Sequence, residues 1–469
     1  MEARFTQGSI MRHIAVMSFT SAIGLATMFV VNFVDLLFIA RIGNQALAAA
    51  AGYAGTILFF TQATSIGFSI SAGTLIGRSL GEKRPKKARE YGTSILLLGL
   101  ILYIPAAVIL WFAAPTLLHL LGARGDTLSA ALIYLHVLVP SIPFVMISML
   151  TSALLRARGD AKTPMNIMVF AGIVNAILDP IFIFDWGLGL GIQGAALATF
   201  IARFIMMSFG FYFACFRHKA FAPISIIRMR HDMGNILSIA VPAVLTNFAT
   251  PVGSMIMVKS MSKYGDQIQA ALAVINQLVP VAFGVVFALS GAIGPIIAQN
   301  YGAKKYDRIK QAIRDANIFN IAWVIVASIS LILMHGVIIR GFKLQGEAVE
   351  LVFLFCSVIS FSFIFVGAVF VSNACFNSLG YPFYSTALNW VRNTIALLPF
   401  VMLGDYFMAD KGIVLGQAVG NILVAIIAVY LSFKVADKVA QGVKRKARIR
   451  DTFKKIPLIQ ALYNHEPPL

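Results

Sequence analysis

Long apolar stretches recur along the whole chain and are separated by short polar or basic segments. A helix needs ~20 apolar residues to cross the hydrocarbon core of a bilayer, and twelve stretches reach that length. The pattern therefore predicts an all-α integral membrane protein with twelve transmembrane helices. We place these helices at residues 13–40, 47–77, 91–121, 127–155, 164–184, 189–214, 234–262, 268–300, 312–338, 348–378, 384–404 and 412–436.

The chain carries two copies of one unit at an offset of 221 residues. Residues 73–84 resemble residues 294–305, and the same offset aligns Gly159 with Gly380. Because each copy holds six predicted helices, both copies enter the membrane from the same side and should be related by an axis along the membrane normal. We therefore predict two parallel six-helix repeats, with an N-lobe at 1–217, a cytoplasmic linker at 218–232, a C-lobe at 233–440 and a basic tail at 441–469.

Small residues recur at matching places in the second helix of each copy. Ser69 and Gly73 align by the offset with Ser290 and Gly294. Such residues let helix backbones approach closely, so we expect them to have a packing role.

Composition excludes most soluble classes of protein. Apolar residues make up 59% of the chain and charged residues only 12%, about half the usual charged share. Too few polar residues remain to cover a soluble enzyme, a secreted disulfide scaffold or a nucleic-acid binder. The three cysteines form no close pair and no metal-ligand spacing, so they indicate neither redox chemistry nor a metal site.

The net charge of +19 reflects topology rather than nucleic-acid binding. Most of the 38 Lys and Arg residues fall on one side of the predicted helices. The positive-inside rule assigns that side to the cytoplasm, so both termini should be cytoplasmic. The segment 444–455 is more basic than topology requires. Attraction to anionic lipid headgroups explains this excess, and docking to a partner is the alternative.

Two carboxylates lie well inside predicted helices, where each costs ~2.5–3.5 kcal/mol on the mildest insertion scale. Asp35 in the first helix follows Asn32 by three residues. Asp179 in the fifth helix has Asn175 one turn before it, on the same face, and Pro180 directly after it. A proline removes one helical hydrogen bond and kinks the helix.

The second copy lacks these acids, since the matching positions are Met257 and Phe400. We therefore predict an ion-coupling site in the N-lobe alone. The alternative is that Asp35 and Asp179 have only a structural role. Two carboxylates in one low-dielectric pocket do not both ionise easily and titrate as a unit. This suits H⁺ as the coupling ion, and Na⁺ is the rival. We expect no other cofactor.

Three further polar residues inside helices are candidates for the substrate cleft: Arg203, Arg392 and His136. We favour a structural role for the arginines, and a lone His in such a helix is typically a hydrogen-bonded packing residue. The abundant Phe (37) and Met (18) would give the cleft an adaptable apolar wall that attracts lipophilic cations.

Over about residues 1–440 the sequence resembles the MATE (multidrug and toxic compound extrusion) family, in its DinF-like branch. The resemblance rests on Asp35 followed by Arg41-Ile42-Gly43 and Ala48, on residues 77–81 with the basic loop that follows, on Asn175-x-x-x-Asp179-Pro180, and on residues 191–196. It implies a V-shaped twelve-helix exporter of cationic or amphipathic drugs, driven by inward H⁺ or Na⁺. It also implies a protein of the bacterial cytoplasmic (inner) membrane, and we expect a monomer in contact with membrane lipids.

The sequence departs from the wider family pattern in two respects. The NorM-like branch carries acids in its seventh and tenth helices, whereas residues 247–258 and 370–377 have none. DinF-like mechanisms have invoked bending of the first helix at a proline. Here that helix has no proline before Arg41, so Gly24 is the candidate hinge.

We therefore expect a secondary active multidrug exporter that works by H⁺ antiport at Asp35, Asn175 and Asp179, with Asn32, Pro180 and Gly24 in support. A Na⁺-coupled exporter and a lipid-linked-precursor flippase are the alternatives. The flippase should need a strongly cationic cleft, for which Arg203 and Arg392 are little support. An intramembrane enzyme is disfavoured because no H-E-x-x-H motif occurs. A seven-helix receptor does not fit the duplication, and two acids in one lobe do not form a ring around a pore.

Overall fold

The computed structural model describes residues 3–41 and 45–454, and these are almost entirely helical. The α-helices are α1 (Ile10–Arg41), α2 (Gln45–Gly81), α3 (Pro85–Leu120), α4 (Gly125–Leu138), α5 (Ile142–Ala157), α6 (Lys162–Ile183), α7 (Gly191–Tyr212), α8 (Ile226–Met261), α9 (Asp266–Gly302), α10 (Tyr306–Gly341), α11 (Glu347–Ser357), α12 (Phe363–Leu379), α13 (Pro382–Trp390) and α14 (Leu397–Lys454). Short 3₁₀ turns form η1 (Arg4–Thr6), η2 (Val139–Ser141), η4 (Ser262–Tyr264) and η5 (Ile359–Ser362), and π-helical turns form η3 (Phe213–Arg217) and η6 (Val391–Ile395).

The predicted all-α fold with twelve membrane helices is confirmed. In the described chain, ten helical segments are long and apolar enough to cross a membrane. One of them, Pro382–Gly442, holds two predicted spans, because the backbone leaves helical geometry at Met408 and Ala409. The helix α2 is not among the ten. It is rich in small and hydroxylated residues. These residues lower the mean hydropathy of the helix, but they let neighbouring helices approach closely.

The fourth predicted span is two helices joined by a tight turn. Pro140 lies in η2 and Pro143 at the start of α5. Since proline cannot donate a backbone hydrogen bond, the α-helical ladder gives way to one 3₁₀ turn between α4 and α5. The combined segment Gly125–Ala157 is long and apolar enough to cross a membrane as one span.

The helix α8 begins inside the segment 218–232 that was predicted as the linker between the two halves of the chain. The helix α8 begins at Ile226, where the Ser225 hydroxyl accepts a hydrogen bond from the Arg228 backbone N–H. Lys87 Nζ and Ser94 Oγ on α3 donate to the fully buried Asp232 at 2.8 and 3.0 Å. Residues 226–232 are therefore the first turns of a helix tied to α3.

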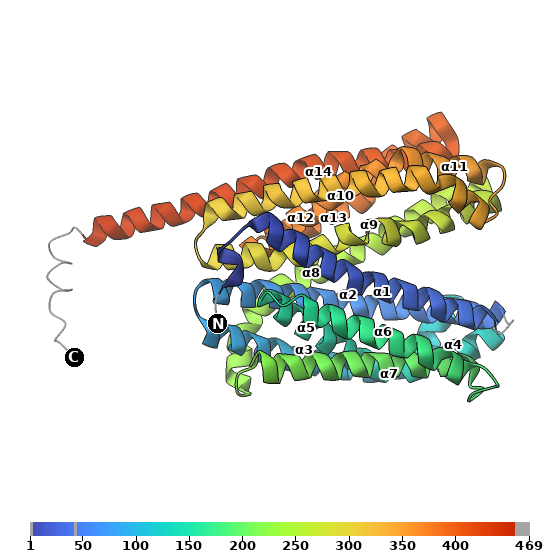
Figure 1. Ribbon diagram of the computed structural model, residues 1–469, viewed down its shortest axis with the longest axis horizontal. Coiled ribbons are helices and arrows are strands. Elements are labelled where there is room, and N and C mark those ends of the chain that lie inside the picture. Colours follow the sequence, from blue (N-terminus) through green and yellow to red (C-terminus); the bar gives the residue numbers. More distant parts are fainter. Residues whose placement is uncertain (1–2, 42–44, 455–469) are drawn as a thin grey trace.

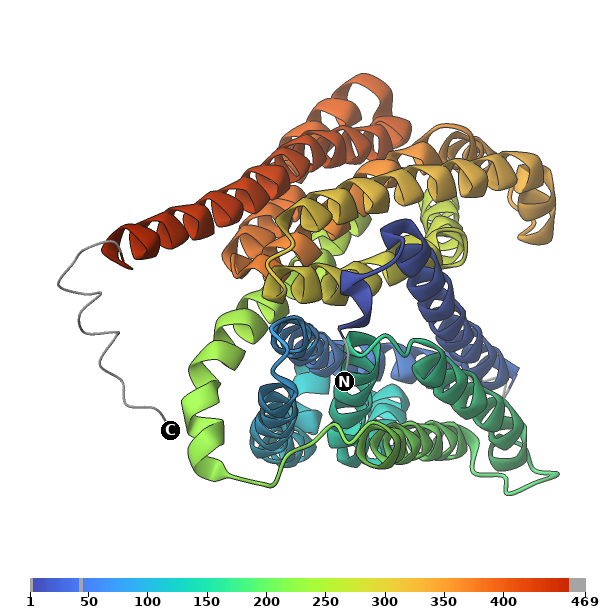
Figure 2. The same ribbon diagram turned by 60° about the vertical axis from the view of Figure 1, so that its left-hand side comes forward.

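We call α1–α7 the N-lobe and α8–α14 the C-lobe. The residue boundaries given for the lobes in the sequence analysis stay a prediction. Figure 1 shows the two groups side by side, with α1 and α8 between them. The helix α1 contacts α6 as well as α9 and α10, and α8 contacts α2 and α3 as well as α13. Figure 2 shows α8 running from one group to the other. These two helices therefore connect the lobes.

The helices α2 and α9 cross where their glycines allow backbone contact. A Cβ added to Gly81 would lie 2.1 Å from the Gln299 carbonyl oxygen, and one added to Gly302 would lie 2.1 Å from the Arg78 carbonyl oxygen. The 221-residue offset exchanges these two contacts, because it relates Gly81 to Gly302 and Arg78 to Gln299. Such reciprocal contacts are the mark of a two-fold relation. The lobes therefore meet about a pseudo-two-fold axis at this end, which we call the inner end.

Candidate functional site

The structure brings together the three residues predicted to couple the ion. Asp35 on α1 is 9% exposed, and Asn175 and Asp179 on α6 are 2% and 0% exposed. Asn175 Nδ2 donates to Asp35 Oδ1 over a long distance of 3.4 Å. The two carboxyl groups lie close enough to interact directly. The site therefore has two acidic groups and one amide on two packed helices.

The carboxyl group of Asp179 is the unusual member of this cluster. Among the residues that the structure describes, neither of its oxygens has a hydrogen-bond partner, although both are buried. A buried polar group without a partner is costly, and an unpaired charge is more costly still. A proton or a small cation bound here would remove part of this cost.

Further polar groups surround the acidic pair. The Tyr134 hydroxyl on α4 lies within electrostatic range of Asp35, Asp179 and Arg203. Arg203 on α7 donates from Nη1 to Ser141 Oγ at 2.8 Å. Arg203 is therefore anchored to η2. Tyr134 was not among the predicted site residues, because an aromatic residue in an apolar helix gives no distinct signal.

The predicted supporting residues have the following places. Pro180 lies inside α6, which continues to Ile183. The helix α1 is continuous through Gly24, where an added Cβ would lie 2.9 Å from Met168 Sδ on α6. Gly24 is thus a close-packing position in this state. The side chain of Asn32 lies outside the described part of the structure, as do residues 455–469 of the basic tail.

The other two cleft candidates, Arg392 and His136, contact aromatic side chains. Arg392 is 8% exposed in the π-helical turn η6, 5.9 Å from the centroid of the Phe370 ring. Its Nε has no hydrogen-bond partner within the described chain. His136 stacks on Trp111 at 4.4 Å between ring centroids, and its Nε2 lies 3.3 Å from the Trp111 carbonyl oxygen. His136 therefore sits at the contact between α3 and α4.

The C-lobe contains a buried network of amide and hydroxyl side chains on α12 and α13. Asn389 Nδ2 on α13 donates to Asn373 Oδ1 on α12 at 3.0 Å. Ser385 Oγ donates to Asn377 Oδ1 at 3.3 Å. All four side chains are buried. This network is uncharged, so it holds no group that exchanges a proton near neutral pH.

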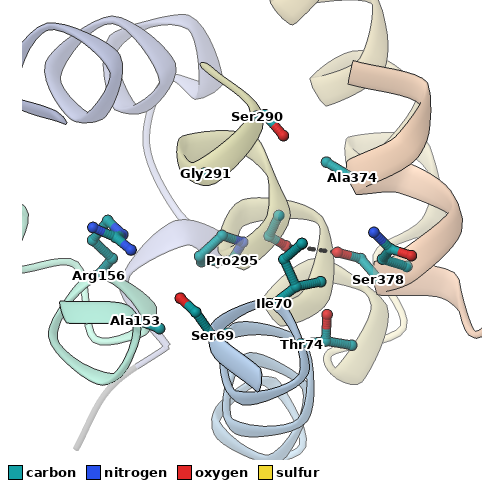
Figure 3. Close-up of a pocket in the computed structure, with 13 residues that line it drawn as sticks. Ser69, Ile70, Thr74, Ala153, Arg156, Ser290, Gly291, Pro295, Ala374 and Ser378 are labelled. Atoms are coloured by element: carbon teal, nitrogen blue, oxygen red, sulfur yellow. Dashed lines mark hydrogen bonds between the residues drawn. The ribbon is translucent and has the colours of Figure 1, made fainter. Parts of the chain in front are cut away.

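A cavity of about 60 Å³ lies between the lobes, lined by α2, α5, α9 and α12. Figure 3 shows Ser69 and Thr74 from α2, Arg156 from α5 and Ser290 from α9 around it. Arg156 is the only charged residue in its described lining. This arginine was not among the predicted site residues, because the predicted helix ended at residue 155, whereas α5 continues to Ala157.

Comparison with known proteins agrees with this fold. The MatE family profile matches residues 21–181 and 242–403. The chain is 28% identical over 429 residues to a FAD transporter of Shewanella oneidensis, covering 90% of this chain and 94% of the relative. It is 27% identical over 417 residues to the probable multidrug resistance protein YpnP of Bacillus subtilis, covering 88% of this chain and 92% of the relative.

A solved structure matches over nearly the full length. The D35N mutant of VcmN, a MATE transporter of Vibrio cholerae, superposes with a TM-score of 0.85 at 24% identity. The match covers 92% of this chain and 97% of that chain. At this level of identity the likeness establishes the fold.

Proposed function

Because the chain belongs to the MATE family of non-enzymatic membrane transporters, we propose that it exports cationic and amphipathic drug-like compounds by antiport with H⁺. The observation that carries the proposal is the buried cluster of Asp35, Asn175 and Asp179, in which Asp179 has no hydrogen-bond partner among the described residues. Intramembrane acids of this kind mark ion pathways. The multidrug name of the Bacillus subtilis relative supports the substrate class.

The proposed cycle links protonation to the packing of α1 against α6. With both acids ionised, repulsion between the two carboxylates and desolvation disfavour close contact of Asp35 with Asp179. A proton that enters from outside relieves this repulsion and lets α1 and α6 pack closely. The resulting shift of α1, which also contacts α9 and α10, makes drug binding in the cleft unfavourable. A membrane potential of 100 mV contributes ~2.3 kcal/mol for each charge moved inward.

We also propose the family branch of the protein, its orientation in the membrane and its oligomeric state. Acids in the N-lobe and amides in the C-lobe support the DinF-like branch. We place both termini in the cytoplasm of a bacterial cell, with the inner end facing the cytoplasm, because the basic segments gather there. We propose a monomer, since the cluster and the cavity are each formed within one chain.

The proposal is tested by removing the charges one at a time. In liposomes with an imposed pH gradient, Asp35→Asn and Asp179→Asn should each lower the rate of ethidium transport by at least about tenfold. The matched control is Asp437→Asn, at a half-exposed acid paired with Lys310, which should transport like the wild type. Full transport in both N-lobe variants would refute the assignment of the coupling site.

A second candidate function, export of an anionic nucleotide such as FAD, is favoured by one observation. Arg156 brings a positive charge to the cavity between the lobes, and no acid is among the described lining residues. The name of the Shewanella oneidensis relative supports this substrate class. Uptake of FAD into the same liposomes under the same pH gradient tests it, and no uptake would refute it.

A further inference from the structure

We infer that the cavity between the lobes is a binding subsite for the phosphate group of an amphipathic substrate, with Arg156 as its cation. The inference rests on the second candidate function, export of an anionic nucleotide, since it assumes that such a substrate passes between the lobes. It adds to that function the substrate's anionic group and the residue that recognises it. Four observations support it: the position of the cavity, its one charge, its unpaired donors and its size.

The cavity lies on the pseudo-two-fold axis. Its lining contains Ser69 with its repeat partner Ser290, and Gly73 with its repeat partner Gly294. Two positions related by a two-fold axis can line one small cavity only if the axis passes through or beside it. One turn further along α2, an added Cβ on Gly77 would lie 2.9 Å from the Ala298 side chain. The cavity is thus the floor of the space between the lobes, directly above their contact at the inner end.

The symmetry is broken at one polar position. Arg156 and its repeat partner Asn377 both line the cavity. At this position the N-lobe contributes a guanidinium and the C-lobe an amide, whereas the neighbouring pair is serine in both lobes. Two arginines facing one axis would repel each other, so one cation and one neutral donor suit a single bound anion.

The donors around this position lack partners in the described chain. The half-buried Arg156 has no neighbouring charge or hydrogen-bond partner in the described chain, and Figure 3 marks no hydrogen bond from Arg156, Thr74 or Ser290 to the other residues that line the cavity. Asn377 accepts a hydrogen bond at Oδ1 from Ser385, which leaves its amide N–H groups available. Hydroxyl, amide and guanidinium donors together match the acceptor oxygens of a phosphate.

The neighbouring arginine at the inner end is different. Arg78 donates from Nε and Nη2 to the Ser378 carbonyl oxygen at 3.0 and 2.9 Å, and its guanidinium lies 4.7 Å from the centroid of the Tyr301 ring. Ser378 in turn donates to the Gly294 carbonyl oxygen at 3.0 Å, as the dashed line in Figure 3 marks. Arg78 is therefore used in packing the lobes together, and Arg156 is the cation that remains for a ligand.

Size and charge together favour an anionic group over a whole drug molecule. A volume of about 60 Å³ is far below the ~300–1,000 Å³ of drug-sized pockets. A half-buried guanidinium without a counter-ion is costly, and it would repel the charge of a cationic drug. A phosphate group supplies the two parallel acceptors that arginine pairs with best. The apolar or aromatic body of the substrate would then extend outward between the lobes.

The test compares two flavins, of which only one carries a diphosphate and the adenosine attached to it, and it isolates the charge with variants of Arg156. Purified full-length protein in nanodiscs is titrated with FAD and with riboflavin, which shares the flavin ring but has no phosphate, and binding is followed by fluorescence anisotropy. Because a charge-assisted hydrogen bond is roughly twice as strong as a neutral one, FAD should bind at least about tenfold more tightly than riboflavin. R156Q should bring the affinity for FAD down to that for riboflavin, and R156K, which keeps the charge but not the two parallel hydrogen bonds, should give an intermediate preference.

Two controls keep the test decisive. R84Q removes one charge from an exposed side chain and should leave the FAD preference unchanged, and thermal melting of each variant verifies that it is folded. Competition by farnesyl diphosphate identifies the source of the phosphate. Displacement of FAD at comparable affinity would support a subsite that also accepts a prenyl-lipid phosphate, whereas no displacement would support a nucleotide-type ligand.

The inference fails if the wild type binds FAD and riboflavin equally, or if R156Q keeps the preference for FAD. These outcomes differ from failure of the exporter proposal. Ethidium transport by the wild type under a pH gradient, with no preference for FAD, would overturn the phosphate subsite and leave the exporter standing.

Discussion

Asp179 is fully buried, and neither carboxyl oxygen meets a hydrogen-bond donor among the described residues. An ionised carboxylate in such a place is expensive, whereas an amide of nearly the same shape carries no charge. A buried group that is expected to lower stability in this way is typical of functional sites. The cost is explained if the side chain must bind and release a proton.

Asp179→Asn should therefore raise stability while it removes transport. The melting temperature of the purified variant at pH 8 should exceed that of the wild type by about 2 °C, because the amide avoids the cost of a buried charge. Asp437→Asn serves as the control and should melt like the wild type. A lower melting temperature for the Asp179 variant would show that its carboxyl group stabilises the fold.

A second acid at the inner end has the opposite character. Asp160 lies in the loop between α5 and α6, outside the membrane-spanning segments. Burial raises the pKa of Asp160, but hydrogen bonds from Thr163 at 3.0 and 2.8 Å and the neighbouring His218 at 3.0 Å outweigh it and hold the pKa below its ordinary value. A carboxyl group whose pKa is lower in the folded than in the unfolded protein stabilises the fold at every pH above its unfolded pKa. This stabilisation is lost as the pH falls through its folded-state pKa.

Asp160→Asn should therefore lower the melting temperature at pH 7. The difference from the wild type should shrink in acid and vanish once the native carboxyl group is protonated. Melting curves of both proteins between pH 7 and pH 3 test this. A difference that stays constant across that range would show that Asp160 acts by shape and not by charge.

At the scale of elements, the segment before α1 ties the two lobes together at the inner end. Phe5 is 2% exposed, and its backbone N–H donates to Gln299 Oε1 at 2.9 Å. Asn300 Nδ2 donates to the Phe5 carbonyl oxygen at 3.1 Å, and Lys305 Nζ to that of Thr6 at 2.8 Å. Residues 3–8 are thus part of the contact that holds the inner end closed.

Phe5→Ala should weaken this closure, since truncation of a buried Phe costs about 3–5 kcal/mol. Spin labels at the exposed positions 83 and 304 report on this closure. The distance between them, measured by pulsed electron paramagnetic resonance, should shift towards longer values. Phe112→Ala, at a residue 77% exposed on α3, is the control and should leave the distribution unchanged. An unchanged distribution in the Phe5 variant would show that α2 and α9 close the inner end without this segment.

At the scale of the whole molecule, the sequence carries most of the fold. A carboxylate in an apolar helix is conspicuous, so Asp35 and Asp179 could be found from the sequence, and the amide at Asn175 followed from helical spacing. Arg156 could not be found in this way. It lies next to the last residue of α5, where an error of two residues in a helix boundary turns a cavity-lining charge into a loop charge.

The start of α8 shows the same limit. Residues 226–232 include three charged side chains and lie inside the segment 218–232 that was predicted as a linker, but Ser225 caps a helix there and Asp232 is held by Lys87. Hydrophobicity marks where a helix enters the membrane, and not where it begins. Contacts across the lobes, such as those of Phe5, depend on tertiary packing that no local pattern records.

The most direct test of the central claim is ethidium uptake by the purified wild-type protein in liposomes, measured first under a pH gradient and then under a Na⁺ gradient at equal pH. Proton antiport predicts uptake driven by the pH gradient alone, and its loss in Asp35→Asn. Uptake driven by Na⁺ alone would contradict proton coupling and make the cluster of Asp35, Asn175 and Asp179 a sodium site. Uptake under neither gradient would contradict the proposed antiport itself.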